Sequence, residues 1–227
     1  MKLEIENIYS EDGRKALTEA YTKSMWSAGV YQKTTWCGVP LLQIPEDMVI
    51  LAELIWKLRP KLIIECGIYK GGGLLLYSSI LQLIGEGCVI GIDVNITHAI
   101  PVKTHPLGDR IMLVQGDSGS PKILDQIRHK LTEKNVLVIL DSDHCAAHVR
   151  EELKVFSPLI PRGGYLVVLD GVMEILHDVP GVPPGWDKDN PETAVKEFLA
   201  ANADFERDMS CNRLGSSFGP GGYLRRK

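Results

Sequence analysis

The chain has 227 residues, 44% of them hydrophobic, which is enough to bury one sizeable core. Its formal charge of −4, without a long run of Lys or Arg, excludes the basic surface that nucleic acids or anionic membranes require. It has neither a run of about eighteen apolar residues nor the apolar core of a secretory leader, so a cytoplasmic protein without membrane or nucleic-acid partners is expected.

Segment 1–44 precedes the first predicted core helix and contains Trp26, Tyr31 and Trp36. We predict that it is a peripheral helical segment. Two interpretations are open: the segment covers a bound substrate and stacks on a ring, or its aromatic residues only pack it onto the domain. Residues 45–227 are predicted to form the main domain.

Five nearly continuous apolar runs follow, separated by helix-forming stretches. Such runs are typical of parallel strands that are buried on both faces. The expected strands are residues 61–67, 88–94, 110–117, 136–143 and 164–171. The expected helices are residues 45–58, 72–84, 122–131 and 146–157. This alternation predicts an α/β fold with a Rossmann-like, doubly wound and mostly parallel sheet.

The regular alternation stops after Asp170. Residues 177–191 are rich in Pro and Gly and are predicted to form a loop that acts as a lid, with Trp186 as a wall of the substrate site. A helix over residues 192–201 and two late strands within 204–208 and 222–226 complete the predicted elements.

Residues 63–73 read IIECGIYKGGG, a strand that enters a glycine-rich turn and opens a helix. Such a turn lets backbone N–H groups and a helix N-terminus approach a ligand closely. It lacks the G-x-G-x-x-G spacing of a dinucleotide site, and Glu65 would repel a pyrophosphate. S-adenosylmethionine fits better, because it has an ammonium and a sulfonium group and no phosphate. We predict that Glu65, Gly67, Gly71 and Gly72 bind it.

Polar residues end the next two predicted strands. Asp93 ends the second strand, where an acid can accept hydrogen bonds from both ribose hydroxyls. The third strand ends in GDS, which places Asp117 and Ser118 near the adenine. The competing interpretation is a glycine-rich helix start surrounded by surface acids.

Carboxylates end the fourth and fifth predicted strands, where Asp141 and Asp143 precede a helix and Asp170 precedes the loop. Adjacent parallel strands lie about 5 Å apart, so these side chains can converge. Converging carboxylates repel one another unless a cation joins them, and hard oxygen ligands favour Mg²⁺ or Ca²⁺. We therefore predict a metal site of Asp141, Asp143 and Asp170, with Asp141 also facing the cofactor. The alternative is that these acids are solvated loop residues.

A metal beside a methyl donor indicates Lewis-acid activation of a substrate hydroxyl, with a nearby base that takes the proton. The candidate bases are Asp143 and His144. His148 follows one helical turn after His144 and can share its face. Either histidine has an alternative role as a supporting or helix-surface residue.

Several longer motifs point to one family. They are WCGVPLLQIPEDM, ECGIYKGGG, LDSDHCAAHVREEL, PLIPRGGYLVVLDG, AVKEFLAANADFERD and GPGGYLRR. From about residue 36 to its end, the chain resembles the cephalosporin hydroxylase family, also called rhamnosyl O-methyltransferase-like, within the class I S-adenosylmethionine-dependent methyltransferases. The resemblance implies the Rossmann-like methyltransferase fold, a homo-oligomer, and binding of S-adenosylmethionine by Glu65, Gly67 and Asp93.

The chain is also similar to macrocin-type sugar O-methyltransferases. That similarity implies that Asp141 and Asp170 are Mg²⁺ ligands and that Asp143 is the base. Those relatives often carry two consecutive acids where this chain has Leu169 before Asp170. We therefore expect weaker metal binding, or a role for Asp143 as a ligand.

The predicted function is an S-adenosylmethionine-dependent, Mg²⁺-assisted O-methyltransferase that acts on a hydroxyl of a sugar or secondary metabolite. Its substrate is a small molecule. Three alternatives are open: a non-haem iron hydroxylase that uses Asp143, His144 and His148, a non-catalytic nucleotide-binding scaffold, and a nicotinamide-dependent oxidoreductase.

Overall fold

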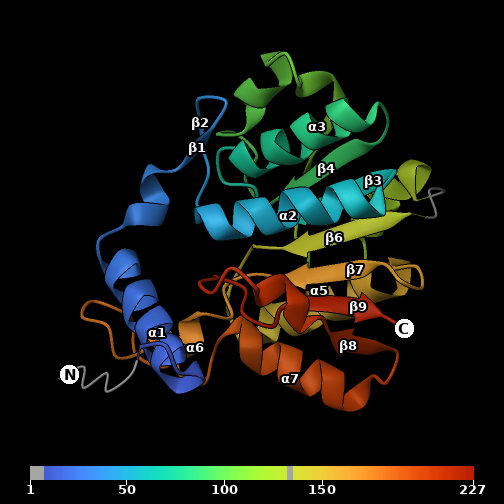
Figure 1. Cartoon of the computed structure of the whole chain (residues 1–227). Coiled ribbons are helices and arrows are strands. Elements are labelled where there is room, and N and C mark those ends of the chain that lie inside the picture. The colour runs from blue at the N-terminus through green and yellow to red at the C-terminus, as the bar shows by residue number, and fades with distance from the viewer. Residues whose placement is uncertain (1–7, 132–134) are drawn as a thin grey trace.

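A seven-stranded sheet forms the centre of the computed structural model, which describes residues 8–131 and 135–227 (Figure 1). The strand order is β5-β4-β3-β6-β7-β9-β8. These strands are β3 (Leu62–Cys66), β4 (Cys88–Asp93), β5 (Ile111–Gln115), β6 (Val136–Leu140), β7 (Tyr165–Val168), β8 (Phe205–Arg207) and β9 (Tyr223–Arg226). β3 to β7 pair in parallel, and β9 is antiparallel to both β7 and β8. The predicted mostly parallel α/β sheet is confirmed.

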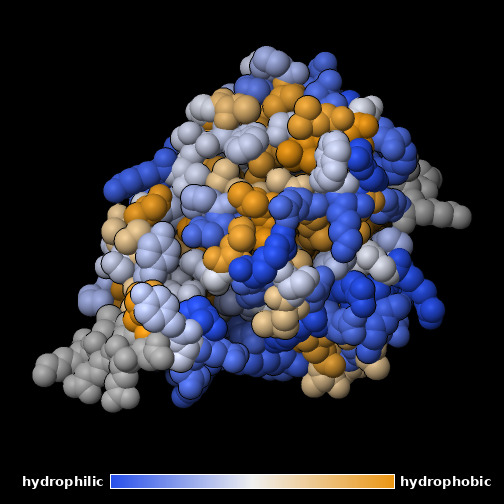
Figure 2. All heavy atoms as spheres, in the orientation of Figure 1, coloured by the Kyte–Doolittle hydropathy of each residue, from blue (hydrophilic) through white to orange (hydrophobic). Residues whose placement is uncertain are grey.

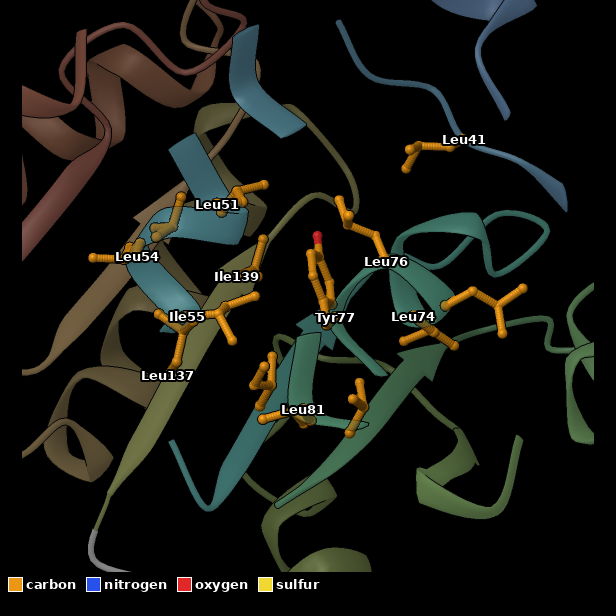
Figure 3. Packing of buried hydrophobic residues seen from close by; sticks show 14 of the residues in the cluster. Leu41, Leu51, Leu54, Ile55, Leu74, Leu76, Tyr77, Leu81, Leu137 and Ile139 are labelled. Carbon is orange, nitrogen blue, oxygen red and sulfur yellow. The ribbon is translucent and has the colours of Figure 1, made fainter. Parts of the chain in front are cut away.

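Helices cover both faces of this sheet. α2 (Pro45–Leu58) and α3 (Gly72–Ile84) pack on one face, and α4 (Ile123–Ile127), α5 (Ala146–Phe156) and α7 (Pro191–Ala201) pack on the other. Successive strand residues point to opposite faces, so Ile63 joins the first core cluster while Leu62 and Ile64 join the second. In Figure 3, Tyr77 of α3 lies among the leucines of the first cluster, with its oxygen pointing away from Leu81.

Short elements complete the chain. They are β1 (Thr35–Trp36), β2 (Val39–Pro40), α6 (Met173–Leu176), and the 3₁₀ turns η1 (Val30–Lys33), η2 (Ile100–Thr104), η3 (Gly108–Arg110), η4 (Arg128–Lys130), η5 (Ser157–Leu159) and η6 (Met209–Asn212). The helix predicted over 122–131 is shorter than expected, because α4 ends at Ile127 and the 3₁₀ turn η4 follows it. Residues 132–134 lie outside the described part.

The strands at the centre of the sheet also end earlier than predicted. β6 stops at Leu140 and β7 at Val168, whereas the apolar patterns suggested strands to residues 143 and 171. The chain turns sharply after β7, because Asp170 has a φ of 56° in the left-handed region. Asp141 and Asp170 therefore lie in loops beyond the strand ends, where their side chains face one edge of the sheet.

The N-terminal segment lies against loops from the other half of the chain. α1 (Glu11–Ser27) begins after Ser10, whose Oγ accepts a hydrogen bond from the Gly13 backbone N–H at 3.0 Å. Thr22 Oγ1 and Ser216 Oγ share a buried hydrogen bond of 2.9 Å, and Lys23 pairs with Asp178. Figure 1 shows α1 beside α6. Residues 1–7 of the predicted segment lie outside the described residues.

The surface mixes charged and apolar side chains. Figure 2 shows apolar groups over α2, bordered by hydrophilic residues. Val49 and Trp56 of this helix are about half exposed. Within the described residues, none of the helices combines the length and apolar character needed to cross a membrane.

Candidate functional site

A cavity of about 770 Å³ opens at the carboxyl ends of the parallel strands. The strand order reverses between β3 and β6, and such a switch point is where open α/β sheets bind ligands. Most of the predicted site residues line this cavity. They are Glu65, Gly67, Gly72, Asp93, Asp117, Ser118, Asp141, Asp143, His144, His148 and Asp170.

Two glycines of the turn let chain segments approach closely beside the cavity. Gly67 has a φ of 82°, and a Cβ at this position would overlap the backbone carbonyl of Asp141. A Cβ at Gly72 would overlap the carbonyl oxygen of Pro40. Both positions therefore require glycine for sterics alone, and they leave the N-terminus of α3 open toward the cavity.

Gly71, the glycine before α3, packs against a neighbouring element. It precedes α3 with a φ of 86°, and a Cβ there would lie 2.6 Å from Cγ1 of Val102. Gly71 thus packs against η2 and does not line the cavity. Its predicted contact with the cofactor stays a prediction, and the structure gives it a steric reason to be glycine.

Glu65 lies inside β3 and is 3% exposed. Its Oε1 accepts a hydrogen bond from the Tyr77 hydroxyl at 2.8 Å, while its buried Oε2 has no hydrogen-bond partner. Burial, and then the negative charge of Asp141, raise the pKa of Glu65 well above its usual range. A buried acceptor without a donor, in the wall of a cavity, suits a positively charged ligand group.

Asp93 and Asp117 are held by backbone N–H groups at the next two strand ends. Asp93 Oδ2 accepts from Ile68 and Oδ1 from Asn95, both at 3.0 Å. Asp117 Oδ1 accepts from Gly119 at 2.9 Å. These bonds hold both carboxylates at the edge of the cavity, at the ends of the two strands that follow the glycine turn in the chain.

Glu152 is a residue that sequence reasoning missed. It is fully buried in α5, and its Oε1 accepts from the hydroxyls of Ser118 and Ser142, each at 2.6 Å. His148 Nε2 lies 3.5 Å from the same oxygen. In sequence Glu152 looks like a solvent-facing helical acid. Its spacing of three residues from buried Val149 was the one signal that it shares the apolar face.

Asp141, His144 and Asp170 form a three-residue group whose ligand atoms all lie within 4.8 Å of one another. His144 Nε2 is 3.2 Å from Asp170 Oδ2 and 3.8 Å from Asp141 Oδ1. Burial, with Asp141 adding, raises the pKa of Asp170, although His144 opposes this. Burial alone would lower the pKa of His144, but Asp170 and Asp141 outweigh it and raise that pKa.

The structure does not bring Asp143 into this group. Asp143 is exposed, and its Oδ1 accepts from the Cys145 backbone N–H at 3.0 Å, which lowers the pKa of its carboxyl. Leu169, which precedes Asp170, is buried in the core. The group therefore has two carboxylates and one imidazole, in place of the three carboxylates predicted.

Aromatic rings from three segments line the other side of the cavity. Trp26 stacks on Tyr31 at a centroid distance of 6.3 Å and meets Trp186 edge to face at 5.6 Å. Tyr31 meets Phe218 edge to face at 5.5 Å. We call Trp26, Tyr31, Trp186 and Phe218 the aromatic wall. Trp36 lies outside it and donates to Ser79 Oγ at 3.2 Å.

The loop that carries Trp186 is attached to the start of α5. Asp189 Oδ1 accepts from the Ala146 backbone N–H at 2.7 Å. A smaller cavity of about 330 Å³ lies there, lined by Asp143, His144 and Trp186 among others. His144 thus stands between two cavities, beside both the carboxylates and the aromatic wall.

Comparison with known proteins identifies the relatives of this chain. Residues 28–227 match the family described as Rhamnosyl O-methyltransferase/CmcI. The chain is 31% identical to the rhamnosyl O-methyltransferase of Mycobacterium leprae (strain TN) over 217 residues, which cover 93% of this chain and 91% of that protein. The rhamnosyl O-methyltransferase of Mycobacterium tuberculosis (strain H37Rv) is also 31% identical, with coverages of 93% and 85%.

Solved structures agree. The structure of CmcI with Mg and S-adenosylmethionine superimposes with a TM-score of 0.66 at 25% identity, covering 86% of this chain and 77% of that one. MycE, solved with Mg, S-adenosylhomocysteine and mycinamycin VI, shares the fold at a TM-score of 0.50 and 24% identity, with coverages of 66% and 41%. The class I methyltransferase fold is thereby confirmed, and the hydroxylase and scaffold alternatives gain no support. The chain belongs to the rhamnosyl O-methyltransferase/CmcI family, as its sequence motifs predicted.

Proposed function

We propose that this O-methyltransferase transfers a methyl group from S-adenosylmethionine to a hydroxyl of a sugar or sugar-bearing metabolite, held beside Mg²⁺ or another divalent cation. Family membership supports the reaction class, and CmcI, which binds Mg and S-adenosylmethionine, supports the cofactors. The observation that carries the proposal is the group of Asp141, His144 and Asp170, which lies in the same cavity as Glu65 and the glycine turn.

The residues present fit S-adenosylmethionine. The unpartnered Glu65 Oε2 offers an acceptor to a cationic group, and Gly67 and Gly72 line the cavity beside it. Asp93 would hold the ribose, while Asp117 and Ser118 would lie near the adenine. These assignments follow the order of the strand ends along the cavity.

The donor set also fits a hard divalent cation. We assign Asp141 and Asp170 as its ligands, because carboxylate oxygens are what Mg²⁺ and Ca²⁺ prefer. An imidazole is a poorer ligand for these ions, so we assign His144 as the base. When bound, the cation would supply positive charge that makes an acceptor hydroxyl easier to deprotonate.

The chain's own side chains then perform the remaining tasks. With a cation on Asp141 and Asp170, the two charges that raise the pKa of His144 would be neutralised, and its Nε2, 3.2 Å from Asp170, would then accept the proton of a hydroxyl held at that edge. The hydroxyl oxygen forms a bond to the methyl carbon as the bond between that carbon and sulfur breaks. The aromatic wall packs against the acceptor ring and excludes water. Asp143 is the second candidate base, because it lines both cavities.

The test separates metal binding, cofactor binding and turnover. We expect EDTA to abolish methyl transfer to a panel of sugar glycosides while calorimetric affinity for S-adenosylhomocysteine stays nearly unchanged. Asp170→Ala should lose Mn²⁺ binding measured by electron paramagnetic resonance, since a charged ligand is removed. His144→Gln should keep Mn²⁺ yet lower turnover by roughly 10²- to 10⁴-fold, as expected for a lost general base.

Two results would contradict the proposal. Full activity after rigorous chelation would show that the reaction needs no metal. Loss of Mn²⁺ binding in His144→Gln would show that this histidine is a metal ligand. Asp143→Asn serves as the matched variant, because it tests the other candidate base beside the same cavity.

A further inference from the structure

Gln43 is a second buried residue with an unsatisfied polar atom in the wall of the cavity. It lies in the segment between β2 and α2, is 4% exposed, and was not among the predicted site residues. Its side-chain Nε2 donates to Asp141 Oδ2 at 3.4 Å. Its Oε1 is buried and has no hydrogen-bond partner.

The contact with Asp141 fixes which end of the Gln43 amide faces which way. The Gln43 amide donates through its NH₂ end and a carboxylate oxygen accepts, so this end points to Asp141. The carbonyl oxygen is then the end left without a donor. A buried carbonyl oxygen without a hydrogen-bond donor destabilises the folded state unless a ligand supplies the missing N–H.

Gln43 and Glu65 line the same cavity, and the chain segments that carry them both lie against the glycine turn. The carbonyl oxygen of Pro40, in the Gln43 segment, sits against Gly72, while Glu65 Oε1 is 2.5 Å from where a Cβ of Gly73 would be. Both Gln43 Oε1 and Glu65 Oε2 lack a donor. This corner of the cavity therefore has acceptors without donors, and no Lys or Arg side chain is among the described residues that line the cavity.

An ammonium group supplies what this corner lacks, because it has three N–H donors and a positive charge. S-adenosylmethionine carries one ammonium group, on its amino-acid end. We infer that Gln43 Oε1 accepts a hydrogen bond from this α-ammonium group, alongside Glu65 Oε2. The inference rests on the proposed function and adds Gln43 as a cofactor-binding residue that also contacts the metal ligand Asp141.

The test uses two ligands that differ only at the amino-acid end. S-adenosylhomocysteine has the ammonium group, and 5′-methylthioadenosine keeps the adenosine and sulfur without it. In Gln43→Leu, which has similar volume and no polar atoms, we expect calorimetric affinity for S-adenosylhomocysteine to fall roughly 10- to 100-fold, as for a lost hydrogen bond to a charged group. Affinity for 5′-methylthioadenosine should change by less than about twofold.

Controls keep the outcome clear. Gln82→Leu makes the same chemical change at an exposed position of α3 outside the cavity, and should leave both affinities unchanged. If Gln43→Leu does not fold, as judged by thermal unfolding, Gln43→Met takes its place. An unchanged affinity for S-adenosylhomocysteine, or an equal loss for both ligands, would overturn the inference. Failure of the wild type to bind S-adenosylhomocysteine would instead contradict the proposed function.

Discussion

Asp170 adopts a left-handed backbone, with a φ of 56°, at the point where its carboxylate must reach Asp141 and His144. This conformation is costly for most residues and less so for Asp and Asn. Backbone strain of this kind concentrates at functional sites. The position of Asp170 after a strand could be predicted from sequence, but its backbone angle, and hence the end of β7, could not.

Other site residues also divide into those that the sequence predicts and those that it does not. Asp93 and Asp141 were recognisable because acids that follow apolar runs mark strand ends. Gln43 and Glu152 were not, because nothing local separates them from ordinary loop and helix residues. Their roles depend on partners distant in sequence, Asp141 for the first and Ser118 for the second.

The ribose assignment of Asp93 gives a prediction at this scale. We expect Asp93→Ala to weaken S-adenosylmethionine binding by about 1.5–3 kcal/mol, the usual cost of losing hydrogen bonds to a charged group. Isothermal calorimetry measures this directly. Asp109→Ala, at an exposed acid outside the cavity, is the control. Equal affinity of wild type and Asp93→Ala for S-adenosylmethionine would contradict the assignment of Asp93 to the ribose.

At the scale of elements, the ends of α2 and α3 were more predictable than those of β6 and β7. α2 and α3 begin and end at the predicted residues. Pro45 occupies the first turn of α2, and Gly85 ends α3 in a left-handed conformation, which are strong local signals. β6 and β7 lack such signals, so their apolar patterns continued past the observed ends.

The start of α3 depends on close packing at Gly72. Gly→Ala within a helix normally stabilises it by about 0.5–1 kcal/mol. Here the new Cβ would overlap the Pro40 carbonyl, so we expect Gly72→Ala to lower the melting temperature and the affinity for S-adenosylhomocysteine. Gly171→Ala is the matched control, since a Cβ there meets only ordinary contacts of 3.6 Å or more. An unchanged or higher melting temperature for Gly72→Ala would contradict the steric argument.

At the scale of the whole molecule, the site joins the N-terminal segment to the sheet domain. Trp26, Tyr31 and Gln43 line the same cavity as the strand-end residues. The predicted division at residues 44 and 45 stays a prediction, as do the homo-oligomer and the cytoplasmic location. Sequence patterns predicted the mostly parallel sheet, but the packing of α1 rests on side-chain contacts that no local pattern encodes.

Asp47 connects α2 to the loop before β9 and gives a prediction about pH. It accepts from Ser217 Oγ and the Phe218 N–H, each at 2.7 Å, and burial raises its pKa from 3.8 to about 6. Between these values the folded state holds the proton more tightly than the unfolded state, so this group's contribution to stability falls as pH rises.

We therefore expect the free energy of unfolding of wild type to fall more steeply from about pH 4 to pH 6 than that of Asp47→Asn. The difference should be on the order of 2–3 kcal/mol across this window. Urea unfolding at several pH values measures it. Because both proteins share every other titrating group, parallel pH profiles would show that Asp47 ionises normally in the fold.

The hydrogen bond between Thr22 and Ser216 joins residues 194 positions apart, and Phe218 of the aromatic wall follows Ser216 by two residues. The predicted contacts to the cofactor from Glu65, Asp93 and Ser118 involve a much shorter stretch of chain. Contacts of long sequence separation form late in folding, because closing a long loop costs entropy before the contacts can repay it. A refolding molecule is therefore expected to acquire its affinity for the methyl donor before it can discriminate between acceptors.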